Sequence, residues 1–191
     1  MKIVLATGNK GKVSELRAII QSDDIITMKE AGFQGEITED GNTFEENALI
    51  KARAVSTALS CVAVADDSGI EVYALDMRPG IYSARYAGEG ASDEDRNRKL
   101  LCELSGKDDM RARYVCAAAV CFPDGREYVC RGEVAGKIVR DAEGDGGFGY
   151  DPIFVPDGFA KTMAQLTPEE KNAISHRAKA FNKLKDYLEG K

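Results

Sequence analysis

The sequence predicts an α/β fold built around a mixed β-sheet. Two apolar runs without alternation, Lys2–Ala6 and Cys61–Ala65, are typical of strands that are covered on both faces. Segments with apolar residues at helical spacing lie beside these runs along the chain. Two further apolar segments, Arg113–Phe122 and Glu127–Arg131, flank a Pro-Asp-Gly-Arg sequence, which predicts an antiparallel hairpin. Together these features indicate one mixed sheet with helices around it.

The N-terminal part predicts a strand, a turn and a helix in that order. Lys2–Ala6 is the strand, and Thr7–Lys12 is a glycine-containing turn. Residues 21–42, beyond the helix, are polar and turn-rich, with an acidic stretch from Glu36 to Asp40. The helix itself is predicted from apolar residues at Val13, Leu16, Ile19 and Ile20.

A second helix is predicted to begin after Thr43. Thr43 and Glu46 form the capping-box pattern T-x-x-E, which is typical of a helix start. Asn47 and Lys51 are four residues apart, so they share one face of this helix. The neighbouring apolar face, which we expect to pack on the sheet, consists of Phe44, Ala48, Ala52, Val55 and Leu59.

The rest of the chain alternates between extended segments, loops and helices. Asp66-Asp67-Ser68-Gly69 is expected to break the strand Cys61–Ala65, and Ile70–Leu75 to resume an extended pattern. Gly132–Arg140 is expected to add a third strand to the hairpin. The other expected elements are a helix at Asp93–Leu104, a glycine-rich loop at Ala142–Tyr150, a short apolar segment at Ile153–Val155, and a helical region that starts with the Thr167-Pro168-x-Glu170 cap and buries Ile174, Ala178, Phe181, Leu184 and Leu188.

The composition is that of a soluble globular protein, with 43% hydrophobic and 30% charged residues in a length of 191. This length accommodates one domain or two closely joined lobes. A net charge of −6 argues against a nucleic-acid polymer as partner, because neutralising phosphates requires clustered Lys and Arg. No apolar run resembles a membrane helix or a signal peptide, so we expect a cytosolic protein that binds no membrane. Five cysteines without a CxxC pair and a single histidine argue against a disulfide framework, a zinc site and a Cys-His nucleophile.

The turn Thr7-Gly8-Asn9-Lys10-Gly11-Lys12 is the first candidate binding element. Its glycines let the backbone approach an anion, and the amides and dipole at a helix start favour phosphate. Lys10 and Lys12 add positive charge. The pattern differs from the P-loop pattern G-x-x-x-x-G-K-[ST]. By itself it fits both a phosphate site and an ordinary strand–helix turn.

The adjacent carboxylates Asp66 and Asp67 are the second candidate. Carboxylate oxygens suit a hard cation such as Mg²⁺, and one carboxylate could accept a proton from water. Neighbouring residues on a strand point to opposite faces, so we expect only one of the two to meet a substrate. A solvated turn rich in Asp and Gly is the alternative interpretation.

Three further groups become candidates through their neighbourhood. Glu36, Glu39 and Asp40 either cap the positive end of the helix after Thr43 or reach a metal. Phe148, in the glycine-rich loop, either stacks on a base or folds onto the core. The last group is Lys171, Ser175, His176 and Arg177, whose side chains converge only if the helix is broken near residues 172–175. The alternative interpretation of this group is an ordinary charged helix start.

Taken together and in this order, the segments resemble the inosine triphosphate pyrophosphatase family. The match covers nearly the whole chain, and its specificity comes from the number of segments in register. The matching stretches are Leu5–Lys12 (LATGNKGK), Glu39–Ala52 (EDGNTFEENALIKA), Ala65–Gly69 (ADDSG), Pro79–Tyr86 (PGIYSARY), Gly146–Pro152 (GGFGYDP) and Glu169–Arg177 (EEKNAISHR).

The resemblance implies an enzyme that cleaves the α–β phosphoanhydride of ITP, dITP and XTP, which are products of purine deamination. The products are a nucleoside monophosphate and pyrophosphate, and the implied role is to remove these nucleotides before polymerases use them. The resemblance also implies Mg²⁺ dependence, a homodimer, and one domain over residues 1–191 in which an elongated mixed sheet, flanked by helices, divides two lobes with a central active-site cleft.

The family's residue roles carry over onto matching positions. Asp67 matches the general base that activates water and approaches the metal, and Lys51 matches a phosphate-contacting lysine. Glu39 matches a metal ligand, although Glu36 and Asp40 are close in the sequence. The expected substrate contacts are Thr7, Gly8, Asn9, Lys10, Gly11, Lys12, Ser68, Phe148, Gly149, Tyr150, Asp151, Lys171, His176 and Arg177.

The chemistry of a 6-oxo purine agrees with this assignment. Arg177 can donate to O6, and Asp151 or a loop carbonyl can accept from N1–H. Adenine reverses both groups, and a site built on hydrogen bonds can reject such an analogue by roughly 10⁴–10⁵. Two other functions fit the sequence: a related pyrophosphatase for modified pyrimidine or methylated nucleotides, and a nucleotide sensor without turnover.

Overall fold

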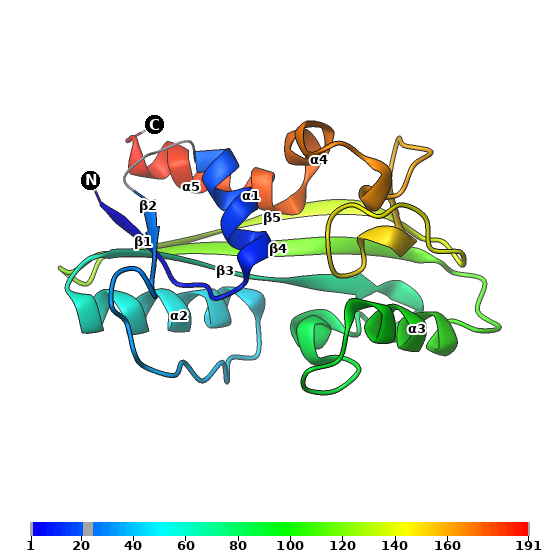
Figure 1. Cartoon of the computed structure of the whole chain (residues 1–191), viewed down its shortest axis with the longest axis horizontal. Helices are drawn as coiled ribbons and strands as arrows, with labels where there is room; N and C mark the ends of the chain where they lie inside the picture. Colours follow the sequence, from blue (N-terminus) through cyan, green and yellow to red (C-terminus); the bar gives the residue numbers. More distant parts are fainter. Residues whose placement is uncertain (1, 21–24, 191) are drawn as a thin grey trace. The chain divides into compact units, whose positions relative to one another are not determined.

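The structure is a computed structural model and describes residues 2–20 and 25–190 of the chain. Its strands form one mixed sheet in the order β2-β1-β3-β4-β5-β6 (Figure 1). β1 is parallel to both β2 and β3, whereas β6 is antiparallel to β5. This arrangement confirms the predicted α/β fold with a mixed sheet. The strands are β1 (Ile3–Leu5), β2 (Ile25–Thr27), β3 (Val62–Val72), β4 (Arg111–Cys121), β5 (Glu127–Ile138) and β6 (Phe154–Pro156).

Helices occur where the apolar spacing and the caps predict them. The hydroxyl of Thr43 accepts from the amide of Glu46 (3.1 Å), whereas the Glu46 carboxylate accepts from Asn42 N and not from Thr43 N. Thr167 and Glu170 form the full capping box. The helices are α1 (Lys10–Ile20), α2 (Phe44–Leu59), α3 (Asp93–Glu103), α4 (Pro168–Ile174) and α5 (His176–Leu188), and a 3₁₀ helix, η2, spans Gly80–Arg85.

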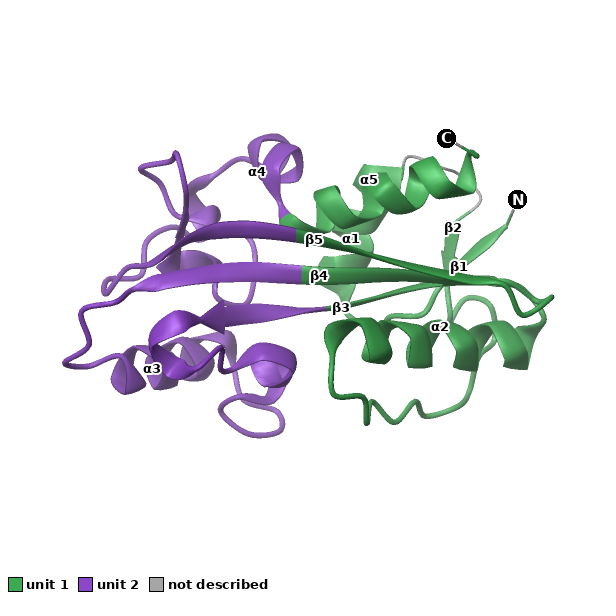
Figure 2. Cartoon of the chain, turned by 180° about the vertical axis from the view of Figure 1, so that it is seen from behind, with its two compact units in different colours: residues 1–67, 116–132, 176–191 green, residues 68–115, 133–175 purple. Residues whose placement is uncertain are grey.

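The chain forms two compact units, coloured separately in Figure 2. Unit 1 comprises Met1–Asp67, Cys116–Gly132 and His176–Lys191, and unit 2 comprises Ser68–Val115 and Glu133–Ser175. Strands β3, β4 and β5 each contribute residues to both units. The cleft and the single-domain organisation implied by the family resemblance stay predictions.

Unit 1 has helices on both faces of its strands. α1 and α5 cover one face and α2 covers the other (Figure 1). The side chains between the strands and the α1–α5 pair are mostly aliphatic, as expected of strands without polar alternation. This core includes Ile3, Leu5, Leu16, Val64, Cys116, Ala118, Val120, Phe181 and Leu184.

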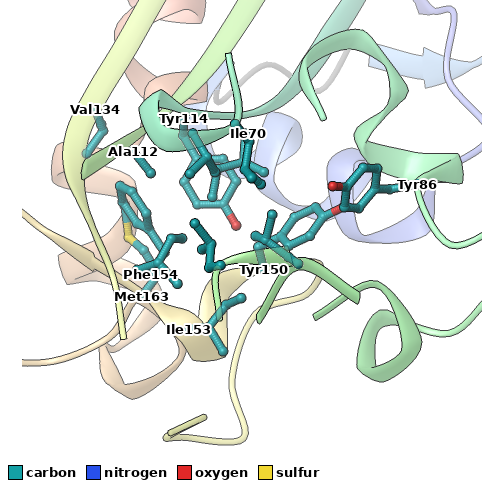
Figure 3. Packing of buried hydrophobic residues seen from close by; sticks show 14 of the residues in the cluster. Ile70, Tyr86, Ala112, Tyr114, Val134, Tyr150, Ile153, Phe154 and Met163 are labelled. Atoms are coloured by element: carbon teal, nitrogen blue, oxygen red, sulfur yellow. The ribbon is translucent and has the colours of Figure 1, made fainter. Parts of the chain in front are cut away.

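Unit 2 has a separate core that is richer in aromatic residues. The rings of Tyr114 and Phe154 meet edge to face with centroids 4.8 Å apart. Figure 3 shows these rings beside Ile70, Tyr150 and Met163. Tyr114 and Tyr150 thus bury their rings in the core while their hydroxyls bond polar partners, which ties the loop around residue 150 to the sheet.

The structure corrects two expected breaks. β3 runs from Val62 to Val72 without interruption, so the Asp66-to-Gly69 segment is not a turn, and β5 runs through Gly132, so no separate third strand begins there. Gly69 and Gly132 instead let the backbone of another segment approach the strand closely. A Cβ on Gly69 would lie 2.3 Å from Gly80 O, and one on Gly132 would lie 2.3 Å from His176 O.

The polar segment at 21–42 was also incompletely predicted. Ile25–Thr27 forms β2, which pairs with β1, although only three residues give too short a pattern to recognise. Residues 21–24 of this segment lie outside the described residues. The described part contains no helix long and apolar enough to cross a membrane.

Candidate active site

The predicted phosphate turn lies at the start of α1 in unit 1. Thr7 accepts from the amide of Asn9 (3.2 Å), and the Asn9 side chain accepts from the amide of Lys12 (3.2 Å). Asn9 therefore caps α1, and Lys10 to Lys12 form its first turn. Gly8, Asn9 and Lys10 are exposed, and the first turn contains no acidic residue. This exposed, uncompensated helix start is suited to an anion.

Asp67 lies at the centre of a buried polar cluster that β3 and α2 form. Its side chain accepts from Asn47 Nδ2 (3.2 Å) and from Lys51 Nζ (3.4 Å), and the residue is 8% exposed. Asn47 and Lys51 occupy the shared helix face that the sequence predicted. Asn47 also accepts from the amide of Gly41 (2.9 Å), which fixes its amide plane against the preceding loop. Asp67 is therefore held in one orientation by two donors from one helix.

Glu39 completes this cluster. Its carboxylate lies 2.6 Å from Lys51 Nζ, so Lys51 bridges Glu39 and Asp67. The two alternatives raised by the sequence, Glu36 and Asp40, are exposed side chains. Of the acidic residues in this loop, Glu39 is the one whose ion pair leads to Asp67.

The charges in the cluster set the protonation of both partners. Burial raises the pKa of Asp67 above its ordinary value, against the opposing effect of Lys51. For Lys51, burial lowers the pKa, but Asp67, Asp66 and Glu39 outweigh it and the pKa is raised. The site therefore combines a carboxylate with increased proton affinity and an ammonium group that stays charged.

Asp66 belongs to a second cluster, which the sequence did not reveal. Its Oδ2 lies 2.8 Å from Lys12 Nζ and 3.5 Å from Arg177 Nε, and the residue is 1% exposed. Arg177 Nη1 also donates to Glu15 Oε2 (2.6 Å). Burial would raise the pKa of Asp66, but the charges of Lys12 and Arg177 hold it well below the usual range. Asp66 is thus an ionised link between α1 and α5 at neutral pH.

Glu15 was missed by the sequence reasoning, although a signal existed. Glu15 follows Lys12 by three residues, so the two share a face of α1. An acidic residue one turn after a lysine that binds an anion must either pair with a cation or weaken the site. Here Glu15 pairs with Arg177, whose side chain is 5% exposed.

The last helical region is broken at Ser175, which is the condition for convergence of Lys171 with His176 and Arg177. Ser175 is extended (ψ 152°) between α4 and α5, so Lys171 belongs to α4 in unit 2 whereas His176 and Arg177 begin α5 in unit 1. His176 is 3% exposed. Ser68 is half-buried on β3, in the part of that strand that belongs to unit 2.

Asp151 organises the glycine-rich loop of unit 2. Its Oδ2 accepts from Lys171 Nζ (2.7 Å) and from the amide of Phe148 (3.0 Å), while its Oδ1 accepts from the Tyr114 hydroxyl (3.2 Å). Asp151 is 3% exposed. Lys171 Nζ also lies 4.9 Å from the centroid of the Phe148 ring. Both oxygens of Asp151 are therefore engaged within the protein, and Phe148 is held beside the ammonium group.

Gly149 and Tyr150 are held by other elements of unit 2. The amide of Gly149 donates to Asp93 Oδ2 (2.7 Å), and its carbonyl accepts from Asn97 Nδ2 (3.2 Å). The Tyr150 hydroxyl donates to Ser83 O (2.8 Å), and Tyr150 is 4% exposed. Tyr150 therefore supports the loop from the core side.

The chain is similar to a known protein family in both sequence and structure. The model of the Ham1 family matches residues 3–187. A protein of Staphylococcus epidermidis named dITP/XTP pyrophosphatase is 46% identical over 188 residues, covering 98% of this chain and 96% of its own length. The solved structure of the Ham1 protein of Staphylococcus aureus has a TM-score of 0.91 at 46% identity and covers 100% of this chain and 99% of its own. A HAM1 protein from Coxiella burnetii gives a TM-score of 0.91 at 38% identity, with 100% coverage of both chains. These similarities confirm the family recognised from the sequence.

Proposed function

The chain belongs to the Ham1 family, and we propose that it hydrolyses ITP, dITP and XTP to the nucleoside monophosphate and pyrophosphate. The relatives' name, dITP/XTP pyrophosphatase, supports this substrate class. The observation that carries the proposal is the buried carboxylate of Asp67, which is held by Asn47 and Lys51. A raised pKa and a fixed orientation suit a group that accepts a proton from water.

In the proposed reaction, Asp67 takes a proton from a water molecule while the water oxygen bonds to the α-phosphorus. The bond to the bridging oxygen breaks, and pyrophosphate leaves with the electron pair. Lys51 offsets the negative charge of the phosphates. Lys10, Lys12 and the amides at the start of α1 bind the remaining phosphate charge. Phosphoryl transfer depends mainly on such positioning and charge stabilisation.

Glu39 and Asp67 are the carboxylates that would hold Mg²⁺. The described residues contain no cluster of three or more His, Cys, Asp or Glu suited to a metal ion. Mg²⁺ is usually bound through one or two carboxylates together with substrate phosphates and water, so this pair fits it. When bound, the ion would neutralise phosphate charge.

We assign base selection to Arg177 and to the loop around Phe148. Arg177 would donate to O6 of the purine. Both oxygens of Asp151 are hydrogen-bonded within unit 2, which favours a loop carbonyl over Asp151 as the acceptor for N1–H. Lys171, His176, Ser68 and the neighbouring loop residues are proposed to contact the substrate as the resemblance implies.

One assay tests the proposal. Pyrophosphate release is measured from dITP, XTP, dGTP and dATP with Mg²⁺, for the wild type, Asp67→Asn and Asp66→Asn. We expect the wild type to turn over the first two, and Asp67→Asn to lose activity by orders of magnitude. Full activity in Asp67→Asn would show that Asp67 is not the group that accepts the proton from water.

The same assay separates the alternative functions. Release of pyrophosphate from dUTP or a methylated pyrimidine triphosphate, but not from dITP, would indicate the related pyrophosphatase. Binding of ITP with Mg²⁺ without any release would indicate a sensor.

We also propose that the protein forms a homodimer through a surface of unit 2. Tyr73, Met77 and Tyr82 are exposed there, and a cavity of about 350 Å³ is lined by Arg78, Pro79, Tyr82, Arg85 and Tyr86. Tyr, Met and Arg are enriched in protein interfaces. Sedimentation of wild type and Tyr82→Glu tests this, because a charge in the interface should give monomers. The expected cytoplasmic location stays a prediction.

A further inference from the structure

The glycine-rich loop needs external contacts to adopt one conformation. Residues 144–149 include Gly144, Gly146, Gly147 and Gly149, and Gly149 has φ +66°. Glycine loses more backbone freedom on ordering than any other residue. The contacts that hold this loop therefore determine how often Phe148 is presented in its bound position.

Helix α3 contacts both polar groups of one loop residue. Asp93 Oδ2 accepts from the amide of Gly149 (2.7 Å), and Asn97 Nδ2 donates to its carbonyl (3.2 Å). Asp93 and Asn97 are four residues apart, so both side chains lie on one face of α3. The pair replaces the two hydrogen bonds that a neighbouring strand would give to Gly149.

Asn97 is an unfavourable residue for helix stability at this position. It is 7% exposed, and its Oδ1 has no hydrogen-bond partner within the described part of the chain. A buried carbonyl oxygen without a partner costs stability, and Asn is a weaker helix former than Leu. The hydrogen bond to Gly149 is the one side-chain bond that Asn97 makes among the described residues.

We propose that Asp93 and Asn97 are positioning residues that fix the Gly149 peptide and so hold the loop ready for the purine base. They touch no reacting atom and act through Gly149 and Phe148. The inference rests on the proposed function, because it assigns the loop to the base. We call the two hydrogen bonds from Asp93 and Asn97 to Gly149 the clamp. If the clamp weakens, a smaller fraction of the protein has the loop in its binding-competent conformation. The apparent affinity for a base-containing ligand then falls in proportion.

The test uses ligands that separate the base from the phosphates. Calorimetric titration measures the Kd of dIMP, which carries the base, and of inorganic tripolyphosphate with Mg²⁺, which does not. In Asn97→Leu we expect the Kd of dIMP to rise about tenfold, while the Kd of tripolyphosphate is unchanged. The Tm should stay the same or rise, because leucine removes the buried Oδ1 that lacks a partner and is a better helix former.

Glu94→Gln is the matched control. Glu94 follows Asp93 in the first turn of α3. Its side chain is 84% exposed and pairs with Arg98. Both Kd values should equal those of the wild type. A double-mutant cycle with Asp93→Ala adds a second criterion. Because both side chains hold one peptide, the double variant should lose less dIMP affinity than the sum of the single losses.

Several results would overturn the inference. These are an unchanged Kd of dIMP in Asn97→Leu, equal losses for dIMP and tripolyphosphate, or no dIMP binding by the wild type. A drop in Tm with both Kd values intact would assign Asn97 to stability alone. If the wild type released no pyrophosphate from dITP, the proposed activity would fail, whereas the dIMP titration would still decide the role of the clamp.

Discussion

The carboxylates of the adjacent residues Asp66 and Asp67 have different partners on opposite faces of β3. Asp66 pairs with Lys12 of α1 and Arg177 of α5, whereas Asp67 contacts Asn47 and Lys51 of α2. α1 and α5 lie on the other side of the sheet from α2 (Figure 1). The alternation of a strand thus separates a structural carboxylate from the proposed base.

Asp66→Asn is expected to lower stability in a pH-dependent manner. Removing the charge leaves Lys12 without its buried partner and leaves Arg177 with Glu15 alone, which should cost about 3 kcal/mol at pH 7. The folded-state pKa of Asp66 is lowered, so its contribution is complete above the unfolded value of about 3.9 and is lost as the pH falls below it. Urea unfolding of wild type and Asp66→Asn at pH 7, 5 and 3 measures this. A stability difference that does not shrink at pH 3 would contradict it.

Glu39→Gln is expected to lower the affinity of the enzyme for Mg²⁺. The change removes one of two carboxylates that Lys51 bridges, so a higher Mg²⁺ concentration should be required for half-maximal pyrophosphate release, by about tenfold. Glu36→Gln is the control, because Glu36 is exposed in the same loop. Chelation with EDTA should abolish activity in all three proteins. Equal Mg²⁺ requirements for Glu39→Gln and Glu36→Gln would count against Glu39 as a ligand.

Arg177→Ala and Glu15→Gln are expected to reduce the preference for dITP over dATP. Glu15 holds the guanidinium of Arg177 at 2.6 Å, and a neutral amide would hold it less firmly. The ratio of kcat/KM for dITP and dATP should fall strongly in Arg177→Ala and about tenfold in Glu15→Gln. Glu127→Gln, which loses a similar pair with Arg53, serves as the control. An unchanged ratio in Arg177→Ala would remove Arg177 from base selection.

Gly69→Ala is expected to destabilise unit 2. The added Cβ would meet Gly80 O at 2.3 Å and Ser83 Oγ at 2.4 Å, so the backbone between β3 and η2 must shift. Overpacking of this kind costs about 1–3 kcal/mol. In Gly35→Ala the nearest atom is the tip of the Phe33 ring, which can move, so the free energy of unfolding should change little. Thermal unfolding of both variants compares the two, and an equal loss would argue against backbone approach as the cause.

The elements that the sequence predicted correctly have long patterns or strong caps. α2 begins directly after its predicted cap residue Thr43, α3 begins at the predicted Asp93, and β3 begins one residue after the start of its predicted run. β2 was missed because three residues carry no periodicity. The predicted breaks at Gly69 and Gly132 were wrong, because local sequence does not distinguish a glycine in a turn from a glycine that admits a neighbouring backbone.

The sequence by itself determined the α/β class, the family and most of the residues proposed for the site, because these depend on residue types at fixed spacings. Tertiary structure decided the roles within that set. It showed that Asp66 is an internal ion-pair partner, that Asp151 is occupied by Tyr114 and Lys171, that Glu15 pairs with Arg177, and that Asn97 bonds to Gly149. Those distinctions depend on which side chains contact one another across elements that are far apart in the chain. Burial lowers the local dielectric constant, and this makes each contact strong enough to fix the charge and orientation of the groups involved.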